Sequence, residues 1–498
     1  MEPAPAYLLP ITENDAQRVS ALALECAKKG GAVYADVRIL RTRTQHIQTR
    51  EDKVQAVCDN ETLGYAVRVL WNGTWGFAAS SNFSEKEVRR IAELAVSVAK
   101  GNSRLQRSPV VLAKSPVSSG YWKTPLEVDP FSVGVQDKVN FQLELNELAR
   151  KGGANFCTSG MTFVHEHKYF NSTEGVSIKQ DLYRQQSAST VTVVDTDRGT
   201  FETRNTLAPA SGQGYEAIQT YPYRDEIQTA VEHAKMKLAA PPVRPGKRDL
   251  IIHPTNLWLT IHESCAHPTE LDRVLGMEAN FAGTSFITLE SVGKLRYGSE
   301  QVTMIADKTQ RHGLSTAGFD DDGTPTCEFP IVDAGLLVNL QSTRELAGAI
   351  GAEQSFATAY ADSWYSVPIQ RIPNISLQPG KKKLSLEELI QDTEDGLLVI
   401  GDDSFSIDMQ RYNFQFSAQE FWEIKNGKRA GLVRDAAYQG NTVQFWNSCD
   451  AVCDSSQYFL GGCFSCGKGE PCQAAPVSHG ASPARFRQVN VLNLKGQR

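Results

Sequence analysis

The stretch LTIHESCAHPTELD, residues 259–272, places two histidines, a glutamate and a cysteine in the six positions 262–267, and these are residue types of a zinc site. His262 and His267 lie five residues apart, whereas the zinc-protease helix H-E-x-x-H spaces its histidines by four. In a regular α-helix, side chains five residues apart diverge by about 140°, so the two imidazoles can share a metal only if the helix is distorted. An accidental arrangement stays open, with His262 on a core face and His267 at a helix end.

Two local distortions would bring the histidines together. A π-bulge would insert one extra residue into the turn. Alternatively, Pro268 disfavours helical backbone at His267, so the helix would end there and His267 would reach the metal from a frayed last turn. Glu263 stands where a general base would take a proton from a water on the metal as that water attacks a peptide carbonyl.

The third ligand must come from elsewhere, because a catalytic zinc takes three protein ligands. A soft thiolate suits zinc, and one C-terminal stretch offers five cysteines: Cys449, Cys453, Cys463, Cys466 and Cys472. A separate structural zinc site of four cysteines is the weaker alternative, because the single C-x2-C pair has no matching second pair.

The first half of the chain mixes helices with β-rich segments. Apolar residues repeat at helical spacing in residues 12–30, 84–101, 135–151 and 224–238. Thr12 can cap the first of these helices, and Ser84 with Glu87 has the spacing of a capping box. Asn72-Gly73 predicts a hairpin turn, and residues 160–205 predict four short strands.

The best domain boundary is LAAPPVRPGKRDL, residues 238–250, which collects three prolines and a glycine. We expect an α+β N-terminal domain over residues 1–240 and a mainly antiparallel β domain over residues 241–498, which carries the metal motif. In the second half, a helix should begin near Thr255 or Asn256. Further short helices are expected at residues 343–350 and 385–392, and strand-separating turns at residues 320–323, 332–335 and 425–428.

Composition excludes several functional classes. The 498 residues have a net charge of −6 and a pI of about 5.9, which gives no general attraction for nucleic acid or an anionic membrane. The N-terminus lacks the basic segment and apolar core of a signal peptide, and no apolar run reaches the ~18 residues of a membrane helix. We therefore expect a cytoplasmic protein, whose ten cysteines are reduced thiols or metal ligands.

Several ordered motifs resemble the TldD/PmbA metallopeptidases, which are also described as modulators of DNA gyrase. His262, Glu263 and His267, followed by Glu270 and Asp272, match the H-E-x-x-x-H and E-x-D pattern of the TldD-like branch. Similar segments follow in family order: ANFAGTSFI (279–287), DDDGTPTCEFPIVDAGLLVNLQST (320–343) and SCGKGEPCQAAPVSHGASPARFRQVNV (465–491). The resemblance covers essentially the whole chain and is strongest from residue 248 onward.

This resemblance implies a zinc metallopeptidase that hydrolyses unstructured peptides or small unfolded proteins, which reach a buried site by strand addition. It implies Zn²⁺ held by His262, His267 and Cys466, with Glu263 as the base. Cys466 is selected because it matches the cysteine of the family's C-G-K segment. The resemblance also implies a dimer, formed by two copies or with a PmbA-like chain.

The same resemblance makes Glu270 and Asp272 candidates for orienting an imidazole. A solvent-facing carboxylate after a helix end is an equal interpretation of Asp272. Pro268 departs from the family, which commonly has glycine there.

Two other functions stay open. A non-catalytic subunit would use the same fold to bind peptides or a partner protein. The intact Glu263 argues against this function, since the inactive PmbA-like branch lacks the motif. A redox-responsive protein would use Cys453, Cys463 or Cys472, which are additions near the proposed ligand and could compete for the metal or pair with Cys466.

Three lesser features complete the candidates. His165 and His167 lie two apart in a predicted strand and so face one side; they can bind a metal, but a polar exposed strand face is favoured. His479 could stabilise an oxyanion. The aspartates at 320–322 suggest calcium, but the following Gly323 favours a plain turn.

Overall fold

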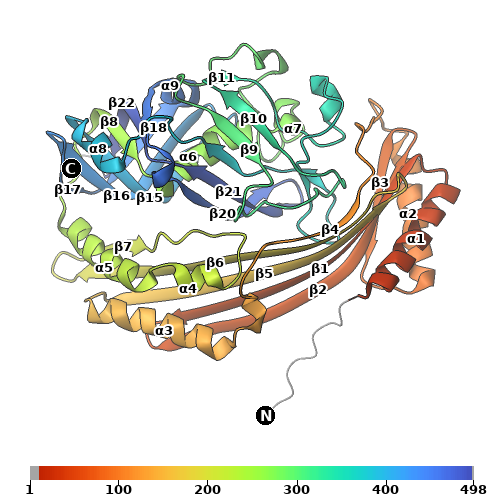
Figure 1. Cartoon of the computed structure of the whole chain (residues 1–498), viewed down its shortest axis with the longest axis horizontal. Coiled ribbons are helices and arrows are strands. Elements are labelled where there is room, and N and C mark those ends of the chain that lie inside the picture. The colour runs from red at the N-terminus through yellow and green to blue at the C-terminus, as the bar shows by residue number, and fades with distance from the viewer. Residues whose placement is uncertain (1–10, 496–498) are drawn as a thin grey trace.

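A long, curved sheet forms the N-terminal part of the chain and holds the C-terminal part against its concave face (Figure 1). This computed structural model describes residues 11–495. The first ten residues, on which most of the signal-peptide expectation falls, lie outside the described range. None of the helices in the described range combines the length and apolarity needed to cross a membrane.

The N-terminal sheet has seven strands in the order β3-β2-β1-β5-β6-β4, with β7 paired to β6. The pairs are antiparallel except β4 with β6. The strands are β1 (Tyr34–Arg50), β2 (Lys53–Trp71), β3 (Thr74–Ser80), β4 (Ser119–Lys123), β5 (Phe156–Ser172), β6 (Ser177–Asp195) and β7 (Thr200–Asn205). The predicted turn at Asn72-Gly73 is confirmed, with φ of 48° and 75°.

The prediction of four short strands over residues 160–205 is wrong in one respect. Residues 186–188, which separate two of the predicted strands, do not break the sheet, because β6 runs unbroken for 19 residues. Ser187 and Ser189 are buried there, and the Ser189 hydroxyl shares a 2.6 Å hydrogen bond with that of Ser159. Small polar residues in this strand fit beneath the covering helices rather than form a turn.

The helices of this part cover the outer face of the sheet in two groups (Figure 1). One group is α1 (Glu13–Lys29) and α2 (Glu85–Asn102); the other is α3 (Val135–Lys151), α4 (Glu216–Thr220) and α5 (Tyr223–Ala239). Thr12 caps α1 as predicted, accepting from the Asp15 amide at 3.1 Å. The capping box at Ser84 is wrong, because the Glu87 carboxylate is bound instead by Ser80 and Arg90.

The C-terminal part is built around a second seven-stranded sheet. Pairings β15–β8, β8–β22, β22–β18, β18–β16 and β16–β15 close a ring, to which β17 and β19 are attached. These strands are β8 (Gly246–Ile252), β15 (Asp395–Ile407), β16 (Asn413–Lys425), β17 (Lys428–Val433), β18 (Ala436–Asn441), β19 (Cys449–Val452) and β22 (Ala484–Asn493). Only β8 with β15 is parallel, so the mainly antiparallel α+β class is confirmed.

Smaller sheets and short helices complete this part. Beside the ring lie β9 (Met304–Asp307), β10 (Glu328–Asp333), β11 (Leu336–Leu337) and β14 (Ile375–Leu377), with the pairs β12 (Ala359–Tyr360) and β13 (Ile369–Gln370), and β20 (Phe459–Lys468) and β21 (Gln473–Ala481). The helices are α6 (Pro254–Ile261), α7 (Leu271–Val274), α8 (Leu386–Gln391) and α9 (Thr442–Asn447).

Two predicted helices of the second half fared differently. The helix expected at residues 385–392 is confirmed as α8, and Ser385 with Glu388 forms a capping box at its start. The helix predicted over residues 343–350 is only a 3₁₀ turn, Ala347–Ile350, because the Arg344 amide is bound to Asp322 and Gly351 ends the turn in a left-handed conformation. The division of the chain at residues 240 and 241 stays a prediction.

The turn of residues 320–323 joins the two parts. Gly323 has a φ of 76°, and its amide donates to the Asp320 carbonyl at 3.1 Å, as the plain-turn interpretation predicts. The buried Asp321 carboxylate accepts a hydrogen bond from Lys168 at 3.2 Å, and the buried Asp322 carboxylate accepts one from Arg68 at 2.7 Å. Both cationic residues belong to the N-terminal sheet. These aspartates therefore bind protein cations and backbone amides.

Candidate metal centre

The motif helix ends in the distortion that the five-residue spacing needs. Helix α6 continues directly into a π turn, His262–Ala266, in which the His267 amide donates to the His262 carbonyl. This wider turn places both imidazoles on one side, with ring centroids 4.7 Å apart. The π-bulge prediction is confirmed.

The alternative based on Pro268 is wrong. His267 keeps helical backbone, with φ of −63° and ψ of −45°, and a short 3₁₀ turn, His267–Thr269, follows it. The chain leaves the helical region only at Glu270, where ψ is 121°. The proline is accommodated at the start of the 3₁₀ turn, where its missing amide costs no helical hydrogen bond.

Three potential ligands converge at this turn. The ligand atoms of His262, His267 and Cys466 all lie within 4.8 Å of one another, and all three residues are buried. Cys466 comes from β20, and its sulfur lies 3.5 Å from the His267 Nε2. Two imidazoles and a thiol are a donor set that fits zinc.

The hydrogen-bond partners assign the tautomers of both histidines. His479 Nδ1 donates to the Ile375 carbonyl at 2.8 Å, which leaves its Nε2 as an acceptor for His262 Nδ1–H, also at 2.8 Å. His267 Nδ1–H donates to Glu270 Oε2 at 2.8 Å. Both candidate ligand histidines therefore keep the Nε2 lone pair available to a metal.

The ionisation of these groups also suits a metal. Burial lowers the pKa of His262 and of His267, so both imidazoles are neutral. Burial alone would raise the pKa of the Cys466 thiol, but His267 and Arg371 lower it below its ordinary value. Burial raises the pKa of the nearby Cys463 to about 11, so Cys466 ionises more readily than Cys463.

A buried lysine supports Glu270 and Asp272. Lys468, fully buried, donates from Nζ to Glu270 Oε1 and to Asp272 Oδ1, both at 2.8 Å. The solvent-facing interpretation of Asp272 is therefore wrong, because the residue is only 6% exposed. Sequence reasoning missed Lys468, although it lies in the C-G-K segment two residues after Cys466.

Arg411 is a second residue that sequence reasoning missed. Its Nε lies 3.0 Å from Glu263 Oε2, yet neither atom has a hydrogen bond of good geometry within residues 11–495. Asp408 shapes this loop by accepting from the amides of Tyr412 at 2.8 Å and Asn413 at 2.9 Å. No local sequence pattern connects Arg411 to Glu263, since the pairing depends on the fold.

Two lesser candidates need correction. His479 cannot donate to an oxyanion as predicted, because both of its ring nitrogens are bound to His262 and Ile375 in a fully buried position. His165 and His167 do not form an exposed strand face; each side chain is only 14% exposed, and both contact Asp181.

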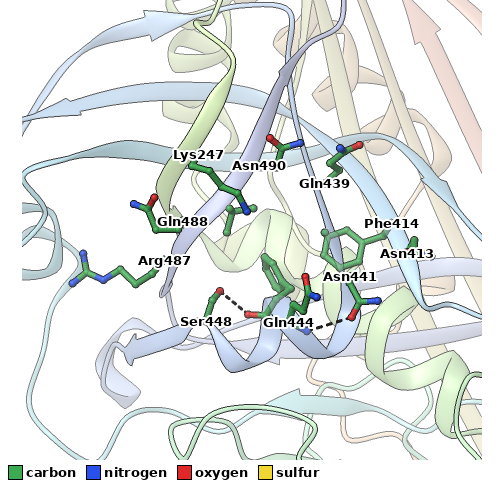
Figure 2. Close-up of a pocket in the computed structure, with 13 residues that line it drawn as sticks. Lys247, Asn413, Phe414, Gln439, Asn441, Gln444, Ser448, Arg487, Gln488 and Asn490 are labelled. Atoms are coloured by element: carbon green, nitrogen blue, oxygen red, sulfur yellow. Dashed lines mark hydrogen bonds between the residues drawn. The ribbon is translucent and has the colours of Figure 1, made fainter.

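Two hollows of similar size lie at different places. The first hollow, of about 360 Å³, lies between strands β6 and β7 on one side and α6 and β20 on the other. Its lining includes Trp258, Asp402, Cys463 and Phe464. The Trp258 ring centroid is 6.3 Å from that of His262, so this hollow leads toward the metal centre. Another, of about 370 Å³, contains no residue of the metal centre and is lined mainly by amide side chains such as Asn413, Gln439 and Gln444 (Figure 2).

Two family models match the chain. Residues 245–493 match the PmbA/TldA metallopeptidase C-terminal domain, and residues 35–99 match PmbA/TldA metallopeptidase domain 1. The first of these matches alone spans half of the chain and includes the whole metal centre.

Curated relatives extend over nearly the full length. A metalloprotease of Methanothermobacter thermautotrophicus is 29% identical over 92% of this chain and 95% of its own. A metalloprotease of Methanocaldococcus jannaschii is 26% identical over 91% and 95%, respectively. A protein of Saccharolobus solfataricus named as a zinc metalloprotease TldD homologue is 22% identical over 93% and 98%.

Solved structures share the fold. A Thermotoga maritima protein, described as a candidate modulator of a DNA gyrase, superposes with a TM-score of 0.74 at 16% identity, covering 96% of this chain and 100% of its own. TldE of Thermococcus kodakarensis gives a TM-score of 0.73 at 15% identity, covering 96% and 99%.

Proposed function

The chain belongs to the PmbA/TldD metallopeptidase family, and from that premise we propose that it is a zinc-dependent peptidase with its metal on His262, His267 and Cys466. The observation that carries this proposal is the buried convergence of two imidazoles and the Cys466 thiol, whose pKa is lowered from its ordinary value. When bound there, zinc supplies a Lewis acid that polarises a water and a peptide carbonyl.

Glu263 is the proposed general base. It is adjacent in sequence to His262, is 6% exposed, and has a buried carboxylate oxygen without a hydrogen-bond partner among the described residues. An unsatisfied buried oxygen suits a group that accepts a proton from a water. That same oxygen, Oε2, lies 3.0 Å from the Arg411 Nε in an ion pair without hydrogen-bond geometry, so it keeps the capacity to accept from a water.

The proposed substrate is an extended peptide. Strand β20 carries Cys466 and pairs with β21 on one edge, and within residues 11–495 its other edge has no partner strand. The hollow beside Trp258 and Cys463 lies along this strand. A peptide added to the free edge would form main-chain hydrogen bonds irrespective of its sequence, which favours unstructured substrates.

Metal analysis tests the ligands. Cobalt bound at this centre should show thiolate-to-cobalt charge-transfer absorption, which His262→Ala and Cys466→Ala should each abolish. Cys463→Ala, three residues earlier on the same strand, is the matched control and should keep the absorption. Persistence of the band in the Cys466→Ala protein would overturn the assignment of that ligand.

Peptide cleavage tests the base. Glu263→Gln preserves size and should retain the cobalt absorption while cleavage of an unstructured peptide falls by about 10²–10⁴-fold. A fully active Glu263→Gln protein would remove Glu263 from the mechanism. A protein that binds metal but cleaves no unstructured peptide, even before mutation, would favour the non-catalytic subunit instead.

We also infer a dimer, formed by two copies or with a PmbA-like chain, as the family resemblance implies. Two touching loops near Arg411, joined by a Phe286 amide to Gln410 carbonyl bond of 3.1 Å, present a surface for a second copy or a PmbA-like chain. The exposed apolar side chains of this surface are Leu275, Met277, Phe281, Met409 and Tyr412 of the loops and Phe405 of β15. Light scattering should report a dimer that Met409→Asp weakens; an unchanged mass would exclude this surface.

A cytoplasmic location is the remaining part of the proposal. None of the ten cysteines, which all lie in the described range, forms a disulfide. A reducing compartment would keep the proposed Cys466 ligand available for zinc. Fractionation of the native cell would check this.

A further inference from the structure

A second cluster of metal-ligand side chains lies on the N-terminal sheet, apart from the metal centre. His165 and His167 of β5 and Asp181 of β6 place their ligand atoms within 4.8 Å of one another. His165 Nε2 and His167 Nδ1 each lie 2.7 Å from the same oxygen, Asp181 Oδ1. His167 and Asp181 are directly opposed across the two strands, so the sheet itself sets their spacing.

The cluster lies between the two groups of covering helices. Along β5, Phe163 packs in the apolar cluster with Leu145 of α3, and Tyr169 packs in the cluster formed with α1 and α2. His165 and His167 fall between them on the same face, because side chains two apart in a strand point the same way. Their 14% exposure leaves solvent access to the cluster.

Neighbouring side chains hold the cluster in place. The Tyr121 hydroxyl of β4 donates to Asp181 Oδ2 at 2.8 Å, which orients the carboxylate and leaves Oδ1 to the histidines. The Tyr183 ring stacks on His165 with centroids 4.1 Å apart and an interplanar angle of 11°. Burial alone would raise the pKa of Asp181, but hydrogen bonds from His165 and His167 hold it well below the usual range, so the group is a carboxylate.

We propose that His165, His167 and Asp181 form a second binding site, distinct from the peptidase centre, for a divalent first-row metal ion such as Zn²⁺. Two imidazoles and one carboxylate suit zinc, cobalt, nickel, manganese or ferrous iron, and no thiol takes part. Ligands around tetrahedral zinc lie about 3.3–3.4 Å apart at bond lengths of about 2.0–2.1 Å. A small opening of the 2.7 Å contacts therefore admits an ion, and water completes its coordination.

The ion would act as a structural link. It would tie β5 to β6 and, through Tyr121 and Asp181, reach β4, which is held to β6 along five paired residues. An ion that binds only the folded sheet stabilises it in proportion to the ion's concentration over its dissociation constant. The competing explanation needs no metal, because two N–H groups donating to a carboxylate already satisfy the cluster.

The test uses the full chain with His262→Ala and Cys466→Ala, which removes the peptidase centre. Calorimetric titration with Co²⁺ and with Zn²⁺ should show one ion bound per chain. The absorption spectrum of the cobalt-bound protein should show d–d bands but no thiolate-to-cobalt charge-transfer band. Zinc at about 100 times its dissociation constant should raise the thermal midpoint by about 2–5 °C.

Adding His167→Gln separates the two explanations, because glutamine keeps an N–H donor for Asp181 but is a poor metal ligand. The His167→Gln substitution should leave the thermal midpoint of the metal-free protein near that of the parent. It should abolish ion binding. His46→Gln is the matched control: His46 lies on β1 of the same sheet, its Nδ1 lies 2.9 Å from the Thr162 hydroxyl, and the substitution should change neither the thermal midpoint nor ion binding. The proposal is overturned if the parent takes up no ion, or if His167→Gln binds ions as the parent does.

Native mass spectrometry of the otherwise unmodified chain gives an independent reading. Zinc-saturated protein should carry two ions per chain, and His167→Gln alone should carry one while retaining peptidase activity. A single ion in both proteins contradicts the proposal.

Discussion

His479 shows how one side chain outside the motif controls the metal centre. Because its Nδ1 is committed to the Ile375 carbonyl, its Nε2 must accept from His262, and this sets which nitrogen His262 offers to a metal. Glu270 does the same for His267. The motif supplies the candidate ligands, but their tautomers are set by His479, 217 residues from His262, and by Glu270, three residues after His267.

His479→Ala should therefore weaken zinc binding by about 10–100-fold, the usual effect of losing a residue that orients a ligand. Competition with a chelator measures this affinity. His479→Gln, whose amide can still donate to Ile375 and accept from His262, should recover part of the loss. Equal zinc affinity in the alanine variant and the parent would show that the His262–His479 contact does not orient the ligand.

The π turn shows, at the scale of the element, why the histidines are five apart. The His267 amide to His262 carbonyl bond spans five residues, and the extra residue keeps both rings on one side. Cys265 and Ala266, inside the turn, belong to the apolar core beneath it. The added residue thus lets two histidines five apart present their rings on one side, which a regular α-helix would not allow.

Deleting Ala266 should abolish metal binding at this centre, even though it restores the H-E-x-x-H spacing. The deletion rotates everything after the turn by about 100° relative to α6, so Glu270 can no longer reach Lys468. Cobalt-thiolate absorption measures the outcome. Cys265→Ala, a substitution in the same turn that keeps its length, should retain the band; a band that survives the deletion would show that the π turn is dispensable.

Strand length was the element-scale property least predictable from sequence. Short runs of Ser, Gln and Ala resemble turn segments, yet in β6 they continue the ladder because they lie beneath helices and bond one another. The hairpin turns were predictable, because positions such as Gly73, Gly335 and Gly427 require positive φ, which is a local property.

Across the whole molecule, buried charges join the two parts. Glu420 of β16 accepts from Arg204 of β7 at 2.8 Å, and its Oε1 also lies 2.8 Å from His233 Nδ1 of α5. Burial would raise the pKa of Glu420, but His233 and Arg204 lower it from 4.5 to about 2. A carboxyl whose folded pKa is depressed stabilises the fold above its unfolded pKa, and that stability is lost as the pH falls toward the folded pKa.

The contribution of Glu420 to the free energy of unfolding should therefore fall by about 3 kcal/mol as the pH is lowered from 4.5 to 2. Denaturant unfolding at a series of pH values measures the free energy of unfolding. Glu420→Gln should be less stable than the parent at neutral pH and should lose less stability across this window. Parallel pH profiles for the two proteins would show that this pair does not link the parts.

The sequence by itself determined the ligand residue types, the need for a helix distortion, the hairpin turns, the main helices and the α+β class, because these depend on local spacing and backbone preference. The residues alone left five cysteines open, and only family resemblance selected Cys466. Tertiary structure decided what lies beside the motif: Cys466 from β20, His479, Lys468 and Arg411. These contacts join residues more than a hundred positions apart, and folding decides them because burial and charge pairing act on neighbours in space.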